Sequence, residues 1–229
     1  MKPNRTDSSI TYSSITDSSI TDSSIPVEVC YPRIVKKVGV LALQGDFREH
    51  RQALERLGCS VQEVRLPKHL IGLEGVIFPG GESTTIGKLM LAYELDAAIK
   101  EFHGNGGAIW GTCAGAIMLA SAVLDSSGQD TGQPRLGLLE MTVVRNAFGR
   151  QVDSFETDLE ILGLEKPFHA VFIRAPIIQS VSMNIDVLCK IDERIVIARK
   201  NRLMASSFHP ELTGDDRLHQ YFLERVVGH

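Results

Sequence analysis

The stretch that decides the fold is Gly-Ala-Ile-Trp-Gly-Thr-Cys-Ala-Gly-Ala-Ile-Met-Leu-Ala, residues 107–120. Residues 108–110 form a short apolar run typical of a buried strand, and a helix-forming run starts after Cys113. Gly111 and Gly115 flank the cysteine, and a sharp strand-to-helix turn around a nucleophile needs such small neighbours. This turn puts the sulfur at the start of the helix, where free amides favour the thiolate. Taken alone, the stretch also fits a buried, inert cysteine.

A second stretch, Ser-Ser-Phe-His-Pro-Glu-Leu at residues 206–212, offers the groups that a thiol nucleophile needs. Pro210 keeps His209 extended, so His209 and Glu211 project from the same side of the chain. A cysteine, a histidine and an acid far apart in sequence are the usual arrangement for thiol catalysis. Alone, His-Pro-Glu could be a polar strand end without a role. Together with the predicted turn at Cys113, it favours a catalytic triad.

Gly-Thr-Cys-Ala-Gly with a distal His-Pro-Glu resembles the class I, triad-type glutamine amidotransferases. Longer motifs resemble one family of that class, the glutaminase subunits of pyridoxal 5′-phosphate synthases, from about Val38 to the C-terminus. Trp110 departs from this family, in which a smaller or less polar aromatic residue is usual. Five motifs in order carry the resemblance: Leu-Gln-Gly-Asp-Phe-Arg-Glu-His (43–50), Pro-Gly-Gly-Glu-Ser-Thr-Thr (79–85), Arg-Asn-Ala-Phe-Gly-Arg-Gln-Val-Asp-Ser-Phe-Glu (145–156), Phe-Ile-Arg-Ala-Pro (172–176) and Ser-Phe-His-Pro-Glu-Leu (207–212).

The resemblance implies hydrolysis of L-glutamine to L-glutamate and ammonia. It also implies a hetero-oligomeric complex in which a separate synthase subunit uses the ammonia to make pyridoxal 5′-phosphate, a form of vitamin B6. Because that product is made on the partner, we expect no cofactor on this chain. Two alternatives stay open. An amidotransferase of another pathway is disfavoured by the motif at residues 145–151, and a non-catalytic assembly protein is disfavoured by the intact Cys113, His209 and Glu211.

The resemblance also implies a role for each site residue. Cys113 attacks the glutamine amide, His209 carries the proton and Glu211 orients His209. Backbone N–H groups of Gly81 and Ala114 hold the oxyanion. The implied substrate contacts are Gly81, Glu82, Ser83, Arg145, Ile173 and Arg174, and Gln44 is expected at the partner border, on the path of the ammonia. Glu82 suits the α-ammonium of glutamine and an arginine suits the α-carboxylate.

Composition excludes several other classes of protein. The 229 residues carry a net charge of −4, which does not indicate nucleic acid or an anionic membrane as partner. No apolar run approaches the roughly 20 residues that span a bilayer, and no signal peptide is evident. Cys30, Cys59, Cys113 and Cys189 lack the spacing of a zinc site or a disulfide framework, so we expect no metal and a reducing cytoplasm.

The pattern along the chain predicts a tail followed by one domain. Residues 6–25 are four copies of a five-residue unit of the type Thr-Asp-Ser-Ser-Ile, which matches neither helix nor strand periodicity. One isoleucine per unit cannot bury a core, so residues 1–33 are expected to be a disordered extension. Residues 34–229 are expected to form the glutamine amidotransferase domain.

Short buried strands alternate with helices in that domain, which predicts an α/β fold with a central mixed, mostly parallel sheet flanked by helices on both faces. The family implies the same fold. The pattern predicts strands at 38–43, 60–66, 75–78, 108–110, 138–144, 170–173, 187–191, 195–200 and 203–208, and helices at 46–57, 85–102, 114–123 and 215–227.

Three polar or reactive segments each follow a predicted strand: Gln44-Gly45, Gly80-Gly81 and Cys113. Working groups gather at the carboxyl ends of parallel strands, so these segments should converge on one crevice. The remaining histidines lack a comparable setting and are expected on the surface or in packing, with a partner contact as the other possibility for His50. They are His50, His69, His103, His169, His219 and His229.

Overall fold

The computed structural model describes residues 11–13, 31–33, 35–145 and 154–228. Its contacts divide the chain into two units, residues 1–36 and 37–229. In the first unit, β1 (Thr11–Ser13) pairs antiparallel with β2 (Tyr31–Arg33). The rest of the predicted extension lies outside the described residues, as do residues 146–153 of the third family motif, at 145–156.

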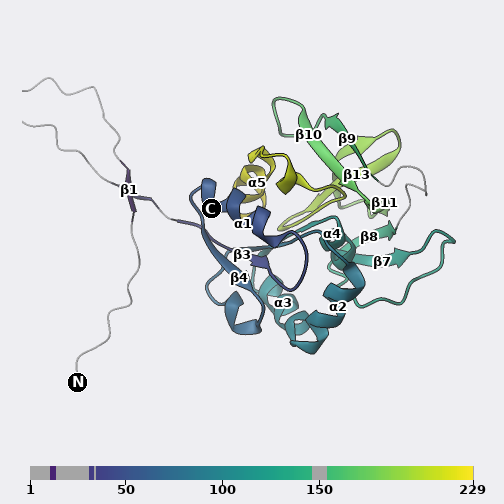
Figure 1. The fold of residues 1–229 in the computed structure, drawn as a ribbon, viewed down its shortest axis with the longest axis horizontal. Coiled ribbons are helices and arrows are strands. Elements are labelled where there is room, and N and C mark those ends of the chain that lie inside the picture. The colour runs from purple at the N-terminus through teal and green to yellow at the C-terminus, as the bar shows by residue number, and fades with distance from the viewer. Residues whose placement is uncertain (1–10, 14–30, 34, 146–153, 229) are drawn as a thin grey trace, which may run out of the picture. The chain divides into compact units, whose positions relative to one another are not determined.

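A ten-stranded sheet forms the centre of the second unit, in the order β4-β3-β5-β6-β14-β13-β11-β8-β7, with β12 paired to β13 (Figure 1). The first five strands in this order run parallel, and β13 is antiparallel to β14. The mixed sheet predicted from the sequence is therefore confirmed. The strands are β3 (Lys37–Leu41), β4 (Ser60–Val64), β5 (Gly75–Phe78), β6 (Ala108–Thr112), β7 (Ala120–Leu124), β8 (Leu139–Val144), β11 (Ile177–Val181), β12 (Asp186–Ile191), β13 (Arg194–Lys200) and β14 (Leu203–Ser206). A separate antiparallel pair is formed by β9 (Ser154–Leu159) and β10 (Phe168–Ile173).

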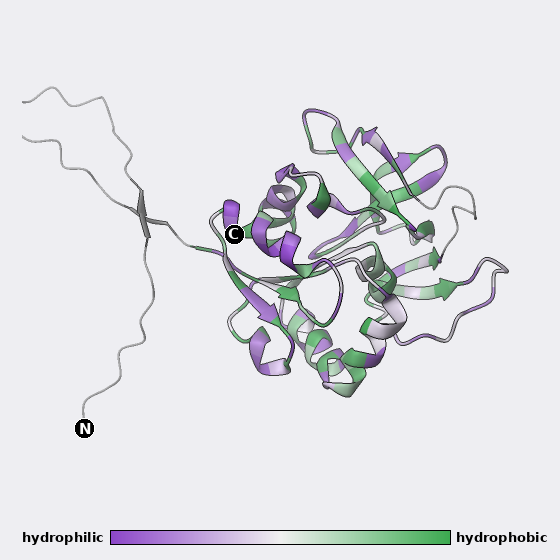
Figure 2. Ribbon diagram, in the orientation of Figure 1, coloured by the Kyte–Doolittle hydropathy of each residue, from purple (hydrophilic) through white to green (hydrophobic). Residues whose placement is uncertain are grey.

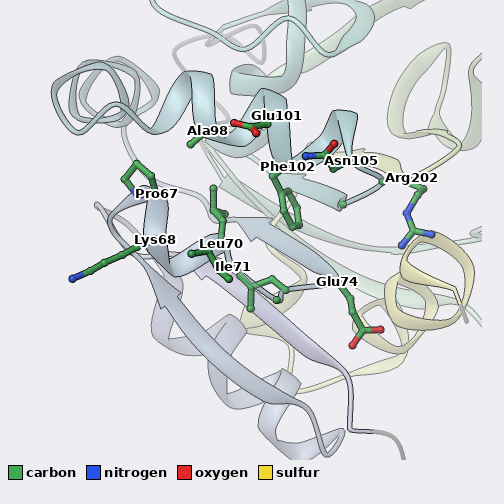
Figure 3. Close-up of a pocket in the computed structure, with 14 residues that line it drawn as sticks. Pro67, Lys68, Leu70, Ile71, Glu74, Ala98, Glu101, Phe102, Asn105 and Arg202 are labelled. Carbon is green, nitrogen blue, oxygen red and sulfur yellow. The ribbon is translucent and has the colours of Figure 1, made fainter. Parts of the chain in front are cut away.

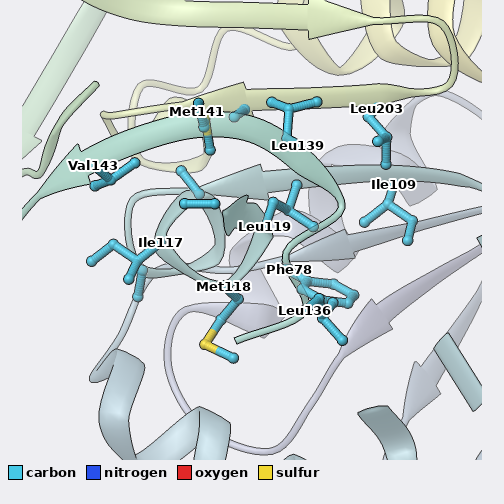
Figure 4. Packing of buried hydrophobic residues seen from close by; sticks show 14 of the residues in the cluster. Phe78, Ile109, Ile117, Met118, Leu119, Leu136, Leu139, Met141, Val143 and Leu203 are labelled. Atoms are coloured by element: carbon cyan, nitrogen blue, oxygen red, sulfur yellow. The ribbon is translucent and has the colours of Figure 1, made fainter. Parts of the chain in front are cut away.

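Successive residues of a strand point to opposite faces of the sheet, and a layer of hydrophobic side chains covers each face. On β5, Val76 and Phe78 pack with residues of α2, α3 and α4, whereas Ile77 packs with residues of α1, α5 and the π-helical turn η3. Figure 2 shows the apolar strands and helix faces, and Figure 4 shows Met118 and Leu119 of α4 among the strand side chains of the first layer. The helical elements are α1 (Phe47–Arg56), η1 (Pro67–Leu70), α2 (Ser83–Ala92), α3 (Leu95–Gly104), α4 (Ala114–Leu119), η2 (Pro210–Leu212), α5 (Arg217–Tyr221) and η3 (Phe222–Val227).

Two of the predicted helices differ from those observed. The single helix expected at 85–102 is two helices, α2 and α3, separated where Glu94 adopts a left-handed φ of 56°. The break lets Leu95 and Ile99 of α3 turn into the core, where both are fully buried. The helix expected at 114–123 ends at Leu119, because the next residues pair with β8 as strand β7.

Within residues 37–229, three strands, β7, β9 and β11, were not predicted, and neither were β1 and β2 in the expected extension. On β9 and β11 most side chains are only partly buried, so the apolar signal that marks a strand is weak there. None of the helices in the described ranges has the length and apolar character needed to cross a bilayer.

Deletion of residues 1–33 is expected to leave the melting temperature within about 2 °C of that of the full chain, because the repeats supply only one isoleucine per five residues to any apolar core. Thermal unfolding of the full and shortened chains, followed by circular dichroism, measures this difference. A loss of several degrees would show that the extension packs on the domain.

Candidate functional site

The loops after four neighbouring strands meet at the carboxyl edge of the parallel part of the sheet. They follow β3, β5, β6 and β14, and they enclose a cavity of about 470 Å³. The sequence-predicted residues converge here: the lining residues are Gln44, Gly45, Asp46, Gly81, Glu82, Ser83, Cys113, Ala114, Ile117, Arg145, Ile173, Arg174, Pro176, His209 and Leu212. Glu211 is the one predicted site residue that does not line the cavity, because it is buried behind His209.

Cys113 occupies the tight turn between β6 and α4. Its φ of 48° lies in the left-handed region, which costs a non-glycine residue about 1–3 kcal/mol and is a frequent feature of active sites. Its amide donates to the carbonyl of Ser206 at 2.8 Å, which ties the turn to β14. A Cβ on Gly115 would lie 2.0 Å from the carbonyl oxygen of Phe78, and one on Gly111 would lie 2.4 Å from Gly115. Both glycines are therefore needed for the close approach that the sequence pattern predicted.

Strand β14 brings His209 to the cysteine. Ser206 pairs in register with Thr112, the residue before Cys113, so the loop after β14 starts beside the turn. The amide of His209 donates to the carbonyl of Val171 on β10 at 2.9 Å. The ring lies against the backbone of Gly80, where a Cβ would be 2.3 Å from Cε1. The position of the ring is thus fixed from two sides.

The pKa of His209 reflects its two polar partners. Burial alone would lower it, but the hydrogen bonds and charges of Cys113 and Glu211 raise it to about 10. Nδ1 of His209 lies 2.8 Å from Oε1 of Glu211. Burial raises the pKa of Glu211, and the contact with His209 opposes this effect. The imidazole is therefore held as a cation at neutral pH, next to the sulfur, the arrangement in which a cysteine acts as a nucleophile.

Asp46 is a second carboxylate near this imidazole, and it was not among the site residues predicted from the sequence. It directly precedes α1, and its Oδ2 lies 3.5 Å from Nδ1 of His209. Among the described residues, Asp46, His209 and Glu211 are the one group with ligand atoms close enough for a metal ion. Nδ1 of His209 already holds a hydrogen bond to Glu211, so the group fits acid–base chemistry, and we assign it no metal.

Two histidines expected on the surface or in packing are fully buried behind Glu211. His50 on α1 points Nδ1 at Nε2 of His219 on α5, at 2.9 Å. Nε2 of His50 lies 3.1 Å from Oγ1 of Thr112 and 3.2 Å from Oε2 of Glu211. This position excludes the partner contact considered for His50. The i, i+4 spacing of Asp46 and His50 is a sequence signal that could have placed both on the side of α1 that faces the triad.

Glu82 and Arg145 form an ion pair on the open side of the cavity, with Nη2 and Oε1 3.2 Å apart. The Glu82 carboxylate also accepts from the amides of Thr84 and Thr85, which caps α2. Burial works against ionisation of Glu82, but these hydrogen bonds lower its pKa below the usual range. Nη1 of Arg145 donates to Oε1 of Gln133 at 2.6 Å, a support that the sequence did not reveal.

The remaining predicted residues surround the sulfur and the loop after β5. Sγ of Cys113 lies 3.9 Å from the carbonyl of Ile173. Arg174 has a left-handed φ of 43° at the cavity wall. Oε1 of Gln44 accepts from the amide of Glu82 at 2.7 Å. Gln44 is thus tied to the segment that contains Gly81, rather than being only a border residue.

Trp110, which departs from the resemblance, fills the space behind the turn. It is fully buried, and its indole N–H donates to Oγ of Ser206 at 3.1 Å. Its ring meets His50 and His219 at steep angles, with centroids 5.9 and 5.0 Å apart. The larger aromatic residue is therefore accommodated with its polar atom satisfied.

A second cavity, of about 620 Å³, opens at the opposite edge of the sheet (Figure 3). Glu74, Gly107 and Arg202, which line it, directly precede β5, β6 and β14. Its described lining residues include neither cysteine nor histidine. Of these two cavities, the one at Cys113 holds the side chains that suit nucleophilic chemistry.

Comparison with known proteins agrees with this geometry. The sequence profile of the SNO glutamine amidotransferase family matches residues 40–228. Two similar proteins, from Deinococcus radiodurans and Thermus thermophilus, are both described as pyridoxal 5′-phosphate synthase subunit PdxT. The first is 57% identical over 81% of this chain and 95% of its own length, and the second is 56% identical over 82% and 96%.

Solved structures lead to the same group. One described as a glutamine amidotransferase has a TM-score of 0.78 and 53% identity, and the match covers 84% of this chain and 99% of that one. The structure of PurLQS from Thermotoga maritima, with a TM-score of 0.58 and 20% identity over 82% of this chain and 97% of that one, shares the fold.

Proposed function

Because the chain belongs to the SNO glutamine amidotransferase family, we propose that it is the glutaminase subunit of a pyridoxal 5′-phosphate synthase. It hydrolyses L-glutamine to L-glutamate and ammonia and passes the ammonia to a separate synthase subunit in a hetero-oligomeric complex. The proposed catalytic domain is residues 34–229, with residues 1–33 as an extension. A thiol nucleophile needs a reducing compartment, so we place the activity in the cytoplasm.

The observation that carries this proposal is the convergence of Cys113, His209 and Glu211 at the carboxyl edge of the sheet, with His209 held as a cation. Cys113 attacks the side-chain carbonyl carbon of glutamine as a thiolate, and the carbonyl electrons move onto oxygen. His209 then gives its proton to the departing nitrogen, so that ammonia leaves and a thioester remains. Water, deprotonated by His209, attacks the thioester, and glutamate is released as the thiolate returns.

Two backbone amides are proposed to stabilise the oxyanion of both tetrahedral states. Ala114 is the first residue of α4, so its N–H cannot bond within the helix. The second donor is Gly81, in the loop after β5. Removing one such donor typically reduces the rate by about 10²–10³-fold.

The substrate is proposed to lie between Cys113 and the Glu82–Arg145 pair. Glu82 would meet the α-ammonium and Arg145 the α-carboxylate, because each group then faces the opposite charge. Thr84 and Gln133 keep the guanidinium in place. The proposal adds Ser83, Ile173 and Arg174 as further contacts around the same cavity.

The full chain, mixed with a pyridoxal 5′-phosphate synthase subunit, is expected to release glutamate and ammonia from glutamine in equal amounts. An enzyme-coupled glutamate assay with and without the synthase measures this. Turnover only with the synthase of another pathway would favour an amidotransferase of that pathway. Absence of turnover with every synthase would favour a non-catalytic assembly protein.

A further inference from the structure

The triad is backed by a chain of buried polar side chains that the reaction described so far does not use. Oε1 of Glu211 faces His209, but Oε2 is buried and makes no aligned hydrogen bond within the described structure. The group next to Oε2 is His50, whose Nε2 lies 3.2 Å away. Beyond His50 lies His219, at 2.9 Å.

The proton positions along this chain follow from its far end. Nδ1 of His219 is buried and has no hydrogen-bond partner among the described residues. A buried N–H group without an acceptor is rarer than a buried acceptor without a donor. We therefore place the proton of His219 on Nε2 and leave Nδ1 unprotonated. Nε2–H of His219 therefore donates to Nδ1 of His50. The proton of His50 is then on its own Nε2, between Thr112 and Glu211.

We propose that His50 is a positioning residue for the triad: its Nε2, whose proton is donated to Thr112, lies 3.2 Å from the second carboxylate oxygen of Glu211, and this polar contact keeps the first oxygen directed at His209. The inference rests on the proposed function in one respect, namely that the His209 cation serves the Cys113 thiolate. His50 touches neither the sulfur nor the substrate cavity.

Burial, nearby positive charges and aromatic packing keep the His50 imidazole neutral and fixed in orientation. Burial, with the charges of His219 and His209, lowers the pKa of His50 well below the usual value, and burial lowers that of His219 to about 4. Both rings are thus neutral at neutral pH, so His50 can act as a donor of fixed direction. Trp110 covers both rings and keeps water out.

The other titratable groups around this network are few. Cys113 and His209 lie on the cavity side, and Asp46 stands at the start of α1. On the far side, Arg56 of α1 and the loop residues Asp215 and Asp216 act on His219. Arg56, Asp215 and Asp216 do not touch Glu211. The effect of a substitution at His50 on His209 and Cys113 is therefore expected to pass through Glu211.

The test compares His50→Ala, His50→Gln and the control Leu54→Ala. Leu54 is fully buried on the same helix, one turn further on, and belongs to the apolar packing cluster of α1, but it has no polar group that could contact Glu211. Loss of packing should therefore affect His50→Ala and Leu54→Ala alike. Glutamine places an amide N–H close to the position of Nε2, so His50→Gln keeps the donor.

With the synthase present, His50→Ala is expected to lower kcat by about 10-fold, the equivalent of a shift of about one pKa unit in the triad, with KM little changed. His50→Gln should recover part of the loss. The alkaline limb of kcat/KM should move to lower pH in His50→Ala, because a weaker Glu211 contact holds the His209 cation less firmly. Leu54→Ala should lower the melting temperature and leave the alkaline limb of the kcat/KM profile unchanged.

A second readout does not depend on glutamine as the substrate. The rate at which iodoacetamide alkylates Cys113 in the isolated chain reports the thiolate directly. In His50→Ala, the pH of half-maximal reactivity should rise by about one unit, a tenfold change in the balance between thiol and thiolate. An unchanged alkylation profile in a folded His50→Ala chain overturns the inference. A shifted profile with no glutamine turnover in the unmodified chain overturns the proposed function and leaves the positioning role intact.

Discussion

Replacement of Cys113 by alanine is expected to reduce glutamine hydrolysis by about 10⁴-fold or more, the loss typical of removing the nucleophile of a triad. The reason is chemical: no other described thiol lines the cavity. The fold should survive, because alanine keeps the Cβ and meets the same backbone strain at φ 48°. Cys113→Ser should be similarly inactive, since a hydroxyl is far less readily ionised beside His209.

Labelling gives an independent measurement of the same claim. A glutamine-analogue electrophile should modify Cys113 and leave Cys189 untouched, because burial raises the pKa of Cys189 to about 11. Cys189→Ala is the matched control and should turn over glutamine at the unmodified rate. Mass spectrometry of the labelled chain locates the adduct. An adduct on another cysteine, or normal turnover in Cys113→Ala, would rule out the proposed triad.

The sequence predicted the fold class because the parallel strands are short and separated by helices, and all of them except β4 are largely buried. Strand β5 was predicted to the residue, since Gly75 and Pro79 delimit an apolar run. The break between α2 and α3 was not predicted, because its cause is tertiary: Leu95 and Ile99 reach the core only if the chain turns at Glu94. The family prediction, made from five motifs, is confirmed by the profile match and the similar proteins.

The residues of the site also divide into those that the sequence predicted and those that only the folded structure reveals. Cys113, His209 and Glu211 carry local signals, namely small neighbours around one and a proline between the others. His219 carries none, and only the packing of α5 against α1 and Trp110 places it beside His50. Gln133 also carries no local sequence signal, because it reaches Arg145 only through the path of a loop in the folded chain. Residues that act through another side chain depend on tertiary contacts, which a sequence pattern does not contain.

The loop that is proposed to complete the oxyanion hole contains two adjacent glycines, Gly80 and Gly81. The carbonyl of Gly80 accepts one long hydrogen bond, 3.3 Å, from the amide of Asp46. Gly81 follows with a φ of 146°, where a side chain would be strained and would also meet Oε1 of Gln44 at 2.5 Å. Neither glycine has a Cβ that would oppose rotation of the peptide between them, and such a rotation would redirect the N–H of Gly81. We propose that a partner docking on the neighbouring Gln44 controls this donor.

From this we expect the isolated chain to turn over glutamine weakly and its synthase to raise kcat by about 10²–10³-fold, the effect of restoring one aligned oxyanion donor. KM should change less, because Glu82 and Arg145 already face the cavity without a partner. Steady-state kinetics at saturating synthase measure both constants, and Cys113→Ala with the synthase gives the background. Equal kcat with and without the synthase would contradict control by docking and would identify an autonomous glutaminase. A fall in KM alone would show that the partner acts on substrate binding rather than on the oxyanion donor.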